Sequence, residues 1–136
     1  MENWKSFLYE SAKDYSLKNS MSNFILAKKY LIEKFEEVLL PLNRIDDNLY
    51  NIEDYSIVRV GNIEIVIFTE FELPGRNIDT LRISKRNVET QEEELSVKFL
   101  LSKNGGKIQY GDSSPEDVTE ESIDLLLKHL FIDSFK

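Results

Sequence analysis

A two-residue link between two strand-like segments is the feature that most limits what this chain can fold into. Residues 55–60 and 63–72 both alternate apolar side chains with other residue types, and this period of two is typical of β-strands. Gly61 and Asn62 alone separate the two segments, and glycine at the first of two loop positions favours a type II′ β-turn. Because a parallel connection needs about a dozen residues or more, these strands are predicted to be antiparallel neighbours.

The same alternation continues along the chain, interrupted by short polar connections. Asn104 and Gly105 form a dipeptide that favours a type I′ turn between two of the later strands. Three further alternating segments lie at residues 78–86, 94–102 and 107–111. The sequence therefore predicts a five-stranded antiparallel meander over residues 55–111.

The first part of the chain, residues 1–40, carries apolar side chains three or four positions apart, which is the spacing of one helical face. Trp4 and the aromatic residues that follow it are predicted to join the core. The polar stretch KNSMSN would divide the region into two helices, with Ser20 or Ser22 as the second N-cap, although one long helix fits the same pattern. Pro41 cannot continue a helix, so the region is predicted to end there.

The end of the chain, residues 114–133, has the pattern of a C-terminal helix. Ser114 would be its N-cap and Pro115 its first helical residue. A chain of 136 residues is long enough to bury one substantial core. We therefore predict a single α+β domain over residues 1–136, in which an N-terminal helix or helix pair and the C-terminal helix pack on one face of the sheet.

Composition and charge exclude several classes of function. The chain has no cysteine and one histidine, which excludes disulfides, a thiolate nucleophile and cysteine-ligated metal sites. Its net charge is −8, and the acidic excess is confined to residues 41–77 and 113–136. Phosphate backbones and anionic membranes would repel such a chain, so we expect neither nucleic acid nor a membrane as a partner.

The sequence also bears on location. No apolar run approaches the roughly 18 residues that span a bilayer, and the first residues lack the basic and apolar pattern of a signal peptide. We therefore expect a cytoplasmic protein.

The predicted hairpins assign partners to the charged residues on the strand at 63–72. The register that follows from the Gly61-Asn62 turn places Arg59 opposite Glu64, and the next hairpin places Arg86 on the other side of Glu64. Opposite charges on neighbouring strands stabilise a sheet by about 0.2–1 kcal/mol per pair. Glu64 is therefore predicted to be structural.

Two other glutamates on the same strand lack such partners. In the predicted register Glu70 and Glu72 face Thr80 and Ile78, and on the other side they point back towards an acidic segment before residue 55. We therefore expect an acidic rim at this end of the sheet, beside an apolar patch on the same face. The predicted partner-binding residues are Glu70, Glu72, Glu53, Asp46, Asp47, Val66 and Phe68.

Glu70 and Glu72 also raise the alternatives of catalysis and metal binding. Glutamates at alternate positions on a strand can perform acid–base chemistry or hold Mg²⁺. A nuclease-like arrangement would also need Lys85, but strand parity places Lys85 on the opposite face. His129 lies on the flank of the last apolar helix face and is predicted to be a boundary residue. We therefore predict no catalytic residue, no metal ligand and no cofactor.

In size, acidity and order of elements, the chain resembles small bacterial immunity proteins and secretion chaperones. We predict a non-enzymatic acidic binding protein, immunity-like or inhibitor-like, that engages a basic protein partner through the acidic rim and the apolar patch. Two alternatives stay open. One is a homodimer that buries the open face of the sheet, and the other is a metal-dependent hydrolase built on Glu53, Glu70 and Glu72.

Overall fold

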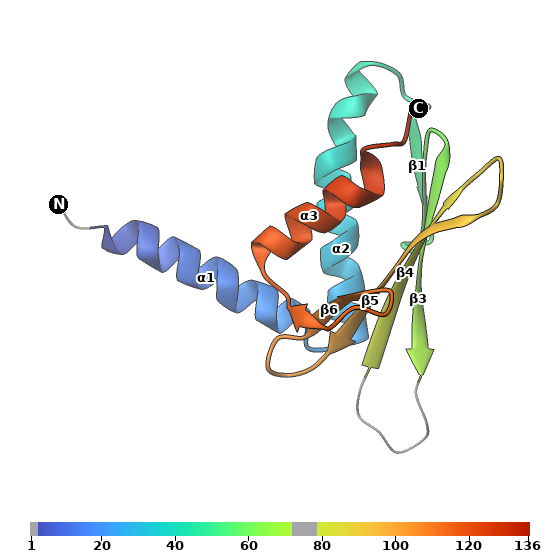
Figure 1. Cartoon of the computed structure of the whole chain (residues 1–136). Coiled ribbons are helices and arrows are strands. Elements are labelled where there is room, and N and C mark those ends of the chain that lie inside the picture. Colours follow the sequence, from blue (N-terminus) through green and yellow to red (C-terminus); the bar gives the residue numbers. More distant parts are fainter. Residues whose placement is uncertain (1–2, 72–78) are drawn as a thin grey trace.

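The computed structural model describes residues 3–71 and 79–136 and has the α+β architecture shown in Figure 1. Two N-terminal helices are followed by an antiparallel sheet and a C-terminal helix. In chain order the elements are α1 (Trp4–Ser20), α2 (Phe24–Leu39), the 3-10 helix η1 (Leu40–Arg44), β1 (Tyr50–Glu53), β2 (Ile57–Val60), β3 (Ile63–Phe71), β4 (Asp79–Asn87), β5 (Glu93–Leu101), β6 (Lys107–Tyr110), β7 (Glu116–Asp117) and α3 (Glu120–Phe131).

The sheet has seven strands in the order of the chain, and every neighbouring pair is antiparallel. The predicted meander is therefore confirmed, but the predicted number of five strands is wrong. One added strand, β1, lies in the acidic segment before residue 55 and pairs Tyr50 with Val60. The other, β7, pairs Asp117 with Lys107. Both are edge strands, of four and two residues, and are too short to show a clear alternation of apolar and polar side chains.

The predicted register of the central hairpins is confirmed. Val60 pairs with Ile63, and Glu64 lies between Arg59 and Arg86. Gly61 has a φ of 55°, the left-handed conformation that glycine at the first position of a type II′ turn adopts.

The connection between β5 and β6 differs from the prediction. Five residues link Leu101 to Lys107, and the register pairs Leu100 with Lys107. Gly105 and Gly106 both have positive φ values, of 108° and 65°. The predicted two-residue turn at Asn104 is therefore wrong, because two adjacent glycines allow a longer loop with two left-handed positions.

The N-terminal region contains two helices, and the break follows Ser20. The second helix is capped by Asn23, whose side-chain oxygen accepts a hydrogen bond from the Leu26 amide at 3.0 Å. The cap is therefore neither Ser20 nor Ser22, whose hydroxyl groups donate to carbonyl groups within the last turn of α1 instead. α2 ends at Leu39, just before Pro41, as predicted.

The C-terminal helix starts five residues later than predicted, at Glu120 and not at Pro115. Its N-cap is Thr119, which exchanges hydrogen bonds with Ser122 in a capping box. The residues predicted as its first turn instead continue the sheet, where Lys107 and Asp117 form an ion pair at 3.0 Å. A reciprocal cap satisfies two backbone donors, so this later start is favoured over the Ser114 signal.

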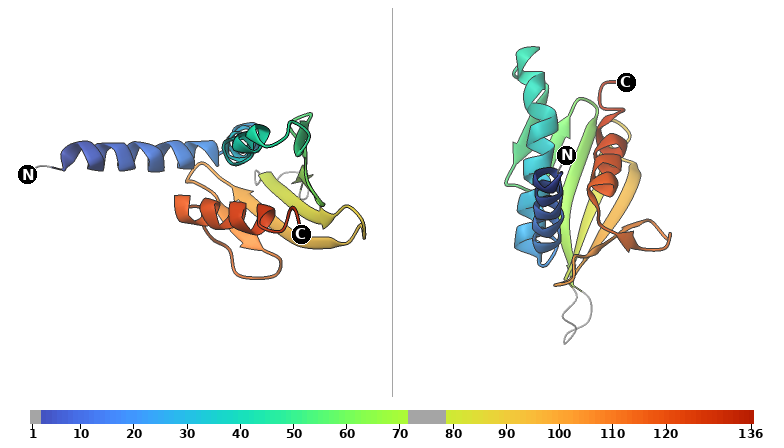
Figure 2. Two further views of the ribbon diagram at one scale, coloured as in Figure 1. Left: turned by 90° about the horizontal axis from the view of Figure 1, so that it is seen from above. Right: turned by 90° about the vertical axis from the view of Figure 1, so that its left-hand side faces the viewer.

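The core lies between one face of the sheet and the helices α2 and α3, which cover that face (Figure 2). Phe35 of α2 and Phe131 of α3 meet edge to face, with ring centroids 5.4 Å apart. Strand residues that alternate in sequence supply the other half, among them Ile65, Ile83 and Phe99. Lys85 is also on this face, as predicted from parity, and its ammonium group donates to the His129 carbonyl at 2.8 Å.

The first helix, α1, does not pack on this face. It extends away from the rest of the molecule and contacts it mainly through its C-terminal end (Figures 1 and 2). Leu17 is buried, whereas Trp4 is 57% exposed and Tyr15 is 76% exposed. The prediction that Trp4 and the aromatic residues of this helix join the core is wrong. Helical periodicity shows which side chains share a face, but it does not show what covers that face.

Candidate functional site

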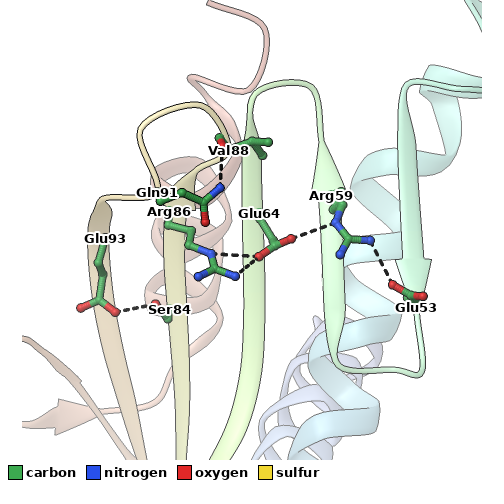
Figure 3. Close-up of polar contacts among 8 residues, drawn as sticks. All are labelled: Glu53, Arg59, Glu64, Ser84, Arg86, Val88, Gln91 and Glu93. Carbon is green, nitrogen blue, oxygen red and sulfur yellow. Dashed lines mark hydrogen bonds and ion pairs between the residues drawn. The ribbon is translucent and has the colours of Figure 1, made fainter.

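Four charged side chains form a row across the open face of the sheet, which we call the ionic ladder (Figure 3). The guanidinium group of Arg59 donates to Glu64 at 2.8 Å and to Glu53 at 3.0 Å. On the other side of Glu64, Arg86 donates through Nε at 2.9 Å and also through Nη2. The prediction that Glu64 is held between two arginines is therefore confirmed, and Glu53 belongs to the same row.

The two arginines change the acidity of the central carboxyl group. Hydrogen bonds from Arg86, and then from Arg59, hold the pKa of Glu64 below its usual value, although partial burial opposes them. The side chain of Glu64 is 12% exposed, so the interactions are only partly screened by water. The ladder thus stabilises the fold when Glu64 is ionised.

We expect the substitution Glu64→Gln to lower the free energy of unfolding by about 1–2 kcal/mol at neutral pH. A depressed pKa contributes stability above the pKa of the unfolded chain and loses it as the pH falls through the folded pKa. The difference between the wild type and Glu64→Gln should therefore shrink in acid. Urea titrations across the acidic range measure it. A difference that is constant with pH would contradict the role of the charge.

A second group of polar side chains lies beside the ladder and covers the predicted apolar patch. Arg82 bonds to Ser96 at 3.0 Å and to Glu93 at 3.4 Å. Its guanidinium group also lies over the ring of Phe68, 5.5 Å from the centroid. Phe68 is 37% exposed and Val66 is half-buried. Arg82 therefore shields part of the Phe68 ring, and the homodimer through the open face stays a prediction.

The structure separates the residues predicted to form the acidic rim. Asp46 and Asp47 precede β1, whose first residue, Tyr50, shares a row with Ile63 at the start of β3. Glu70 is seven residues farther along β3, roughly 23 Å away at about 3.3 Å per residue. Asp46 and Asp47 were predicted to lie near Glu70, and this prediction is wrong. The register of β1 places the acidic segment at the opposite end of the sheet from Glu70.

The remaining two rim residues are described only in part. The backbone of Glu70 pairs with Thr80, as the predicted register required. Glu72 lies outside the described residues. The predicted binding role of these two glutamates stays a prediction.

A groove that sequence reasoning missed runs between α2 and the edge strand β1. It has a volume of about 650 Å³, and we call it the acidic groove. It is lined by Glu33, Glu36, Glu37, Leu40, Asn43, Asp47, Tyr50, Asn51 and Ile52. Within the described part of the chain, Glu37 pairs with Lys34 at 3.5 Å, whereas no ion pair is formed by Glu33, Glu36 or Asp47. The groove thus has a negative wall with apolar residues beside it.

The groove continues along α2 towards the turn between β1 and β2. This second part has a volume of about 570 Å³ and shares Glu33 and Glu36 with the first. Two exposed apolar side chains line it, Ile25 of α2 and Tyr55 of the turn. Tyr55 has a φ of 53°, which is unusual for a bulky residue and costs about 1–2 kcal/mol. Such strain is concentrated at functional positions in proteins.

The signal for this groove was in the sequence but required β1 to be recognised. Glu33, Glu36 and Glu37 follow one another on the solvent side of α2, opposite the buried Leu31 and Phe35. A row of acids on an exposed helix face is ordinary, so nothing marked it as a wall of a groove. The opposing wall is a four-residue strand that alternation alone did not reveal.

In residues 3–71 and 79–136 no group of three or more histidine, aspartate or glutamate side chains is arranged to hold a metal ion. His129 lies near the C-terminus of α3 with its ring edge-on to Tyr110, at a centroid distance of 5.9 Å. Among the described helices, none combines the length and the apolar character that crossing a bilayer demands.

Comparison of the chain with protein-family models, with curated proteins and with solved structures found no significant match. The acidic groove and the exposed side of α1 are therefore the surface features from which a function is inferred.

Proposed function

We propose that this protein is a non-enzymatic binding protein that holds a basic segment of a protein partner in the acidic groove. The observation that carries the proposal is the wall formed by Glu33, Glu36 and Asp47, which lack ion-pair partners within the described residues. Uncompensated like charges repel one another and cost stability. Lysine or arginine side chains from a partner would relieve that repulsion and speed association.

The edge of the sheet gives such a segment a backbone partner as well. Among the described strands β1 pairs with β2 and lies at the edge of the sheet, and its residues 50–52 line the acidic groove. An extended peptide can add to a free edge through main-chain hydrogen bonds, while the pockets beside the edge select its side chains. Because β1 has four residues, a segment of about the same length would fill the edge.

The far end of the groove supports an apolar contact. Ile25 and Tyr55 are exposed on opposite sides of it, and Lys28 and Lys29 also line this part. Lys28 and Lys29 disfavour a basic residue of the partner at this end of the groove, whereas the exposed ring of Tyr55 favours an apolar residue. The partner segment is thus expected to combine basic residues with an apolar residue at one end. An inhibitor-like or immunity-like protein is one kind of binding protein with this chemistry.

The proposal predicts binding of a hexalysine peptide that weakens as salt is added. Replacing Glu33 and Glu36 together with lysine should lower the affinity about tenfold, because two attractive charges become repulsive. The matched control reverses two exposed acids far from the groove, Glu89→Lys with Glu121→Lys, and gives the same net charge. Isothermal titration calorimetry measures all three proteins.

Two outcomes would count against this function. If the wild type does not bind hexalysine, the groove does not hold basic segments. If the control variant loses as much affinity as the groove variant, net charge and not the groove attracts the peptide. The variant Tyr55→Gly separates binding from folding in a peptide that also carries a terminal leucine. Glycine tolerates the positive φ of residue 55, so stability should be kept while affinity falls.

A further inference from the structure

The surface of α1 carries an apolar stripe that nothing in the described molecule covers. We define the stripe as Trp4, Phe7, Leu8 and Tyr15, which are 57%, 75%, 61% and 76% exposed. These residues lie three, four and eleven positions from Trp4, so they share one side of the helix. Three aromatic rings and a leucine on one exposed helix face are more than a soluble surface normally leaves open.

The stripe cannot be covered by the chain's own core while α1 keeps its present attachment. Leu17 is buried against the body, and Lys13 pairs with Glu120 of α3 at 3.3 Å. Tyr15 and Leu17 differ by two residues, which places them about 160° apart around the helix axis. The side of α1 that is attached to the body is therefore nearly opposite to the side that carries the stripe.

Little stabilises the N-terminal end of the helix, although ion pairs of Lys13 with Glu10 and of Lys18 with Asp14 stabilise its C-terminal half. No residue between Trp4 and Ser16 is buried. Asn3 makes no side-chain capping bond, and the first turn contains no acidic residue. Isolated helices shorter than about 12–15 residues are marginal in water, and the stretch of α1 without buried residues, 4–16, is of about this length. In addition, Lys5 places a positive charge near the N-terminus, where it opposes the helix dipole. A partner that packs on the stripe would supply the missing stability.

We propose that the stripe is covered by α1 of a second copy of this chain, so that the protein forms a dimer through its N-terminal helices. The near-neutral charge of α1 favours contact between two copies through this helix. α1 carries three lysines against two acids, whereas the rest of the chain contains the whole acidic excess. Contact between two copies through the acidic segments 41–77 or 113–136 would bring like charges together, whereas contact through α1 would not.

The exposed area is sufficient for such a dimer. Aromatic side chains bury about 150–250 Å² each, so the stripe offers on the order of 600 Å² per copy. Two copies would then bury about 1,200 Å², which is the lower end of the range for specific interfaces. α1 extends away from the sheet and the other helices, which leaves room for a second helix along its length (Figure 2).

The order of large and small residues favours antiparallel pairing. Ser11 and Ala12 follow the large residues at the N-terminal end of the helix and precede Tyr15. In an antiparallel pair with Trp4 of one copy facing Tyr15 of the other, Leu8 of one copy meets Ser11 of the other. Large side chains then fill the space above small ones, as close packing between helices requires.

The sole tryptophan of the chain, Trp4, provides a direct test on the whole protein. Sedimentation equilibrium should give a monomer-to-dimer transition with a midpoint between about 1 and 100 μM. Trp4 fluorescence should shift to shorter wavelength over the same concentrations, because the indole leaves water. Phe7→Ser and Tyr15→Ser should each weaken the dimer by about 30-fold, as removal of a central aromatic anchor does.

The matched control is Leu125→Ser, which removes an exposed apolar residue on α3 and should leave the midpoint unchanged. A protein that stays monomeric at several times the upper concentration would overturn the proposal. So would a dimer that is insensitive to Phe7→Ser and Tyr15→Ser, since another surface would then form it. A Trp4 shift that requires lipid vesicles and occurs in the monomer would also overturn it and assign the stripe to a membrane surface.

Discussion

Replacing Phe35 with alanine should lower the free energy of unfolding by about 4 kcal/mol, because a large aromatic side chain is removed from a fully packed site. Phe35 of α2 has no exposed surface and packs in the core between the sheet and α3. Its ring meets Phe131 edge to face at 5.4 Å, which adds to the energy of burial. Urea unfolding followed by far-UV circular dichroism measures the loss.

The control for this substitution lies on the same helix. Val38 is 41% exposed, so Val38→Ala should change the stability by about 0.5 kcal/mol or less. A loss below about 1.5 kcal/mol for Phe35→Ala would mean that α3 closes on the cavity. In that case α2 and α3 would not be held at a fixed separation by this pair of rings.

The central part of the sheet could be predicted because local rules determine it. The two residues Gly61 and Asn62 leave one way for β2 and β3 to pair, and alternation then assigns each side chain to a face. From this register and that of the next hairpin, the position of Glu64 between two arginines followed. Strand parity placed Lys85 on the face opposite to Arg86, but its burial was not predicted.

The edges of the sheet could not be predicted in the same way. β1 has four residues and β7 has two, so neither is long enough for alternation to distinguish a strand from a polar loop. The error at β1 carried over to the candidate site. Without β1, Asp47 was assigned to a rim with Glu70, and the wall that it shares with Glu36 of α2 was not recognised.

The position of α1 shows a different limit of prediction from sequence. The spacing of Trp4, Phe7 and Tyr15 correctly indicates one apolar face of a helix. A face of this kind is equally compatible with the core of the same chain and with another molecule. The choice depends on the attachment of the helix through Leu17, which is buried, and through Lys13, which pairs with Glu120 of α3.

Replacing Gly61 with alanine should lower the free energy of unfolding by about 3 kcal/mol, since two separate costs add. The first is the φ of 55°, which disfavours any residue with a side chain. The second is steric, because a Cβ at this position would lie 2.0 Å from the carbonyl oxygen of Ser134 and 2.7 Å from the ring of Phe135. Type II′ turn chemistry predicted a glycine here, but the close approach of the C-terminal tail is a second reason that local sequence does not contain.

The chain offers a control that separates these costs. Gly111 has a φ of 52°, but no atom lies within 4 Å of the Cβ that alanine would add. Gly111→Ala should therefore cost about 1 kcal/mol, from the backbone conformation alone. The larger loss for Gly61→Ala reflects displacement of the tail, whose Ser134 carbonyl accepts a hydrogen bond from the Asn62 amide at 2.6 Å. Faster hydrogen exchange at Asn62 in Gly61→Ala would show this displacement, whereas equal losses for the two variants would mean that the tail does not hold the turn in solution.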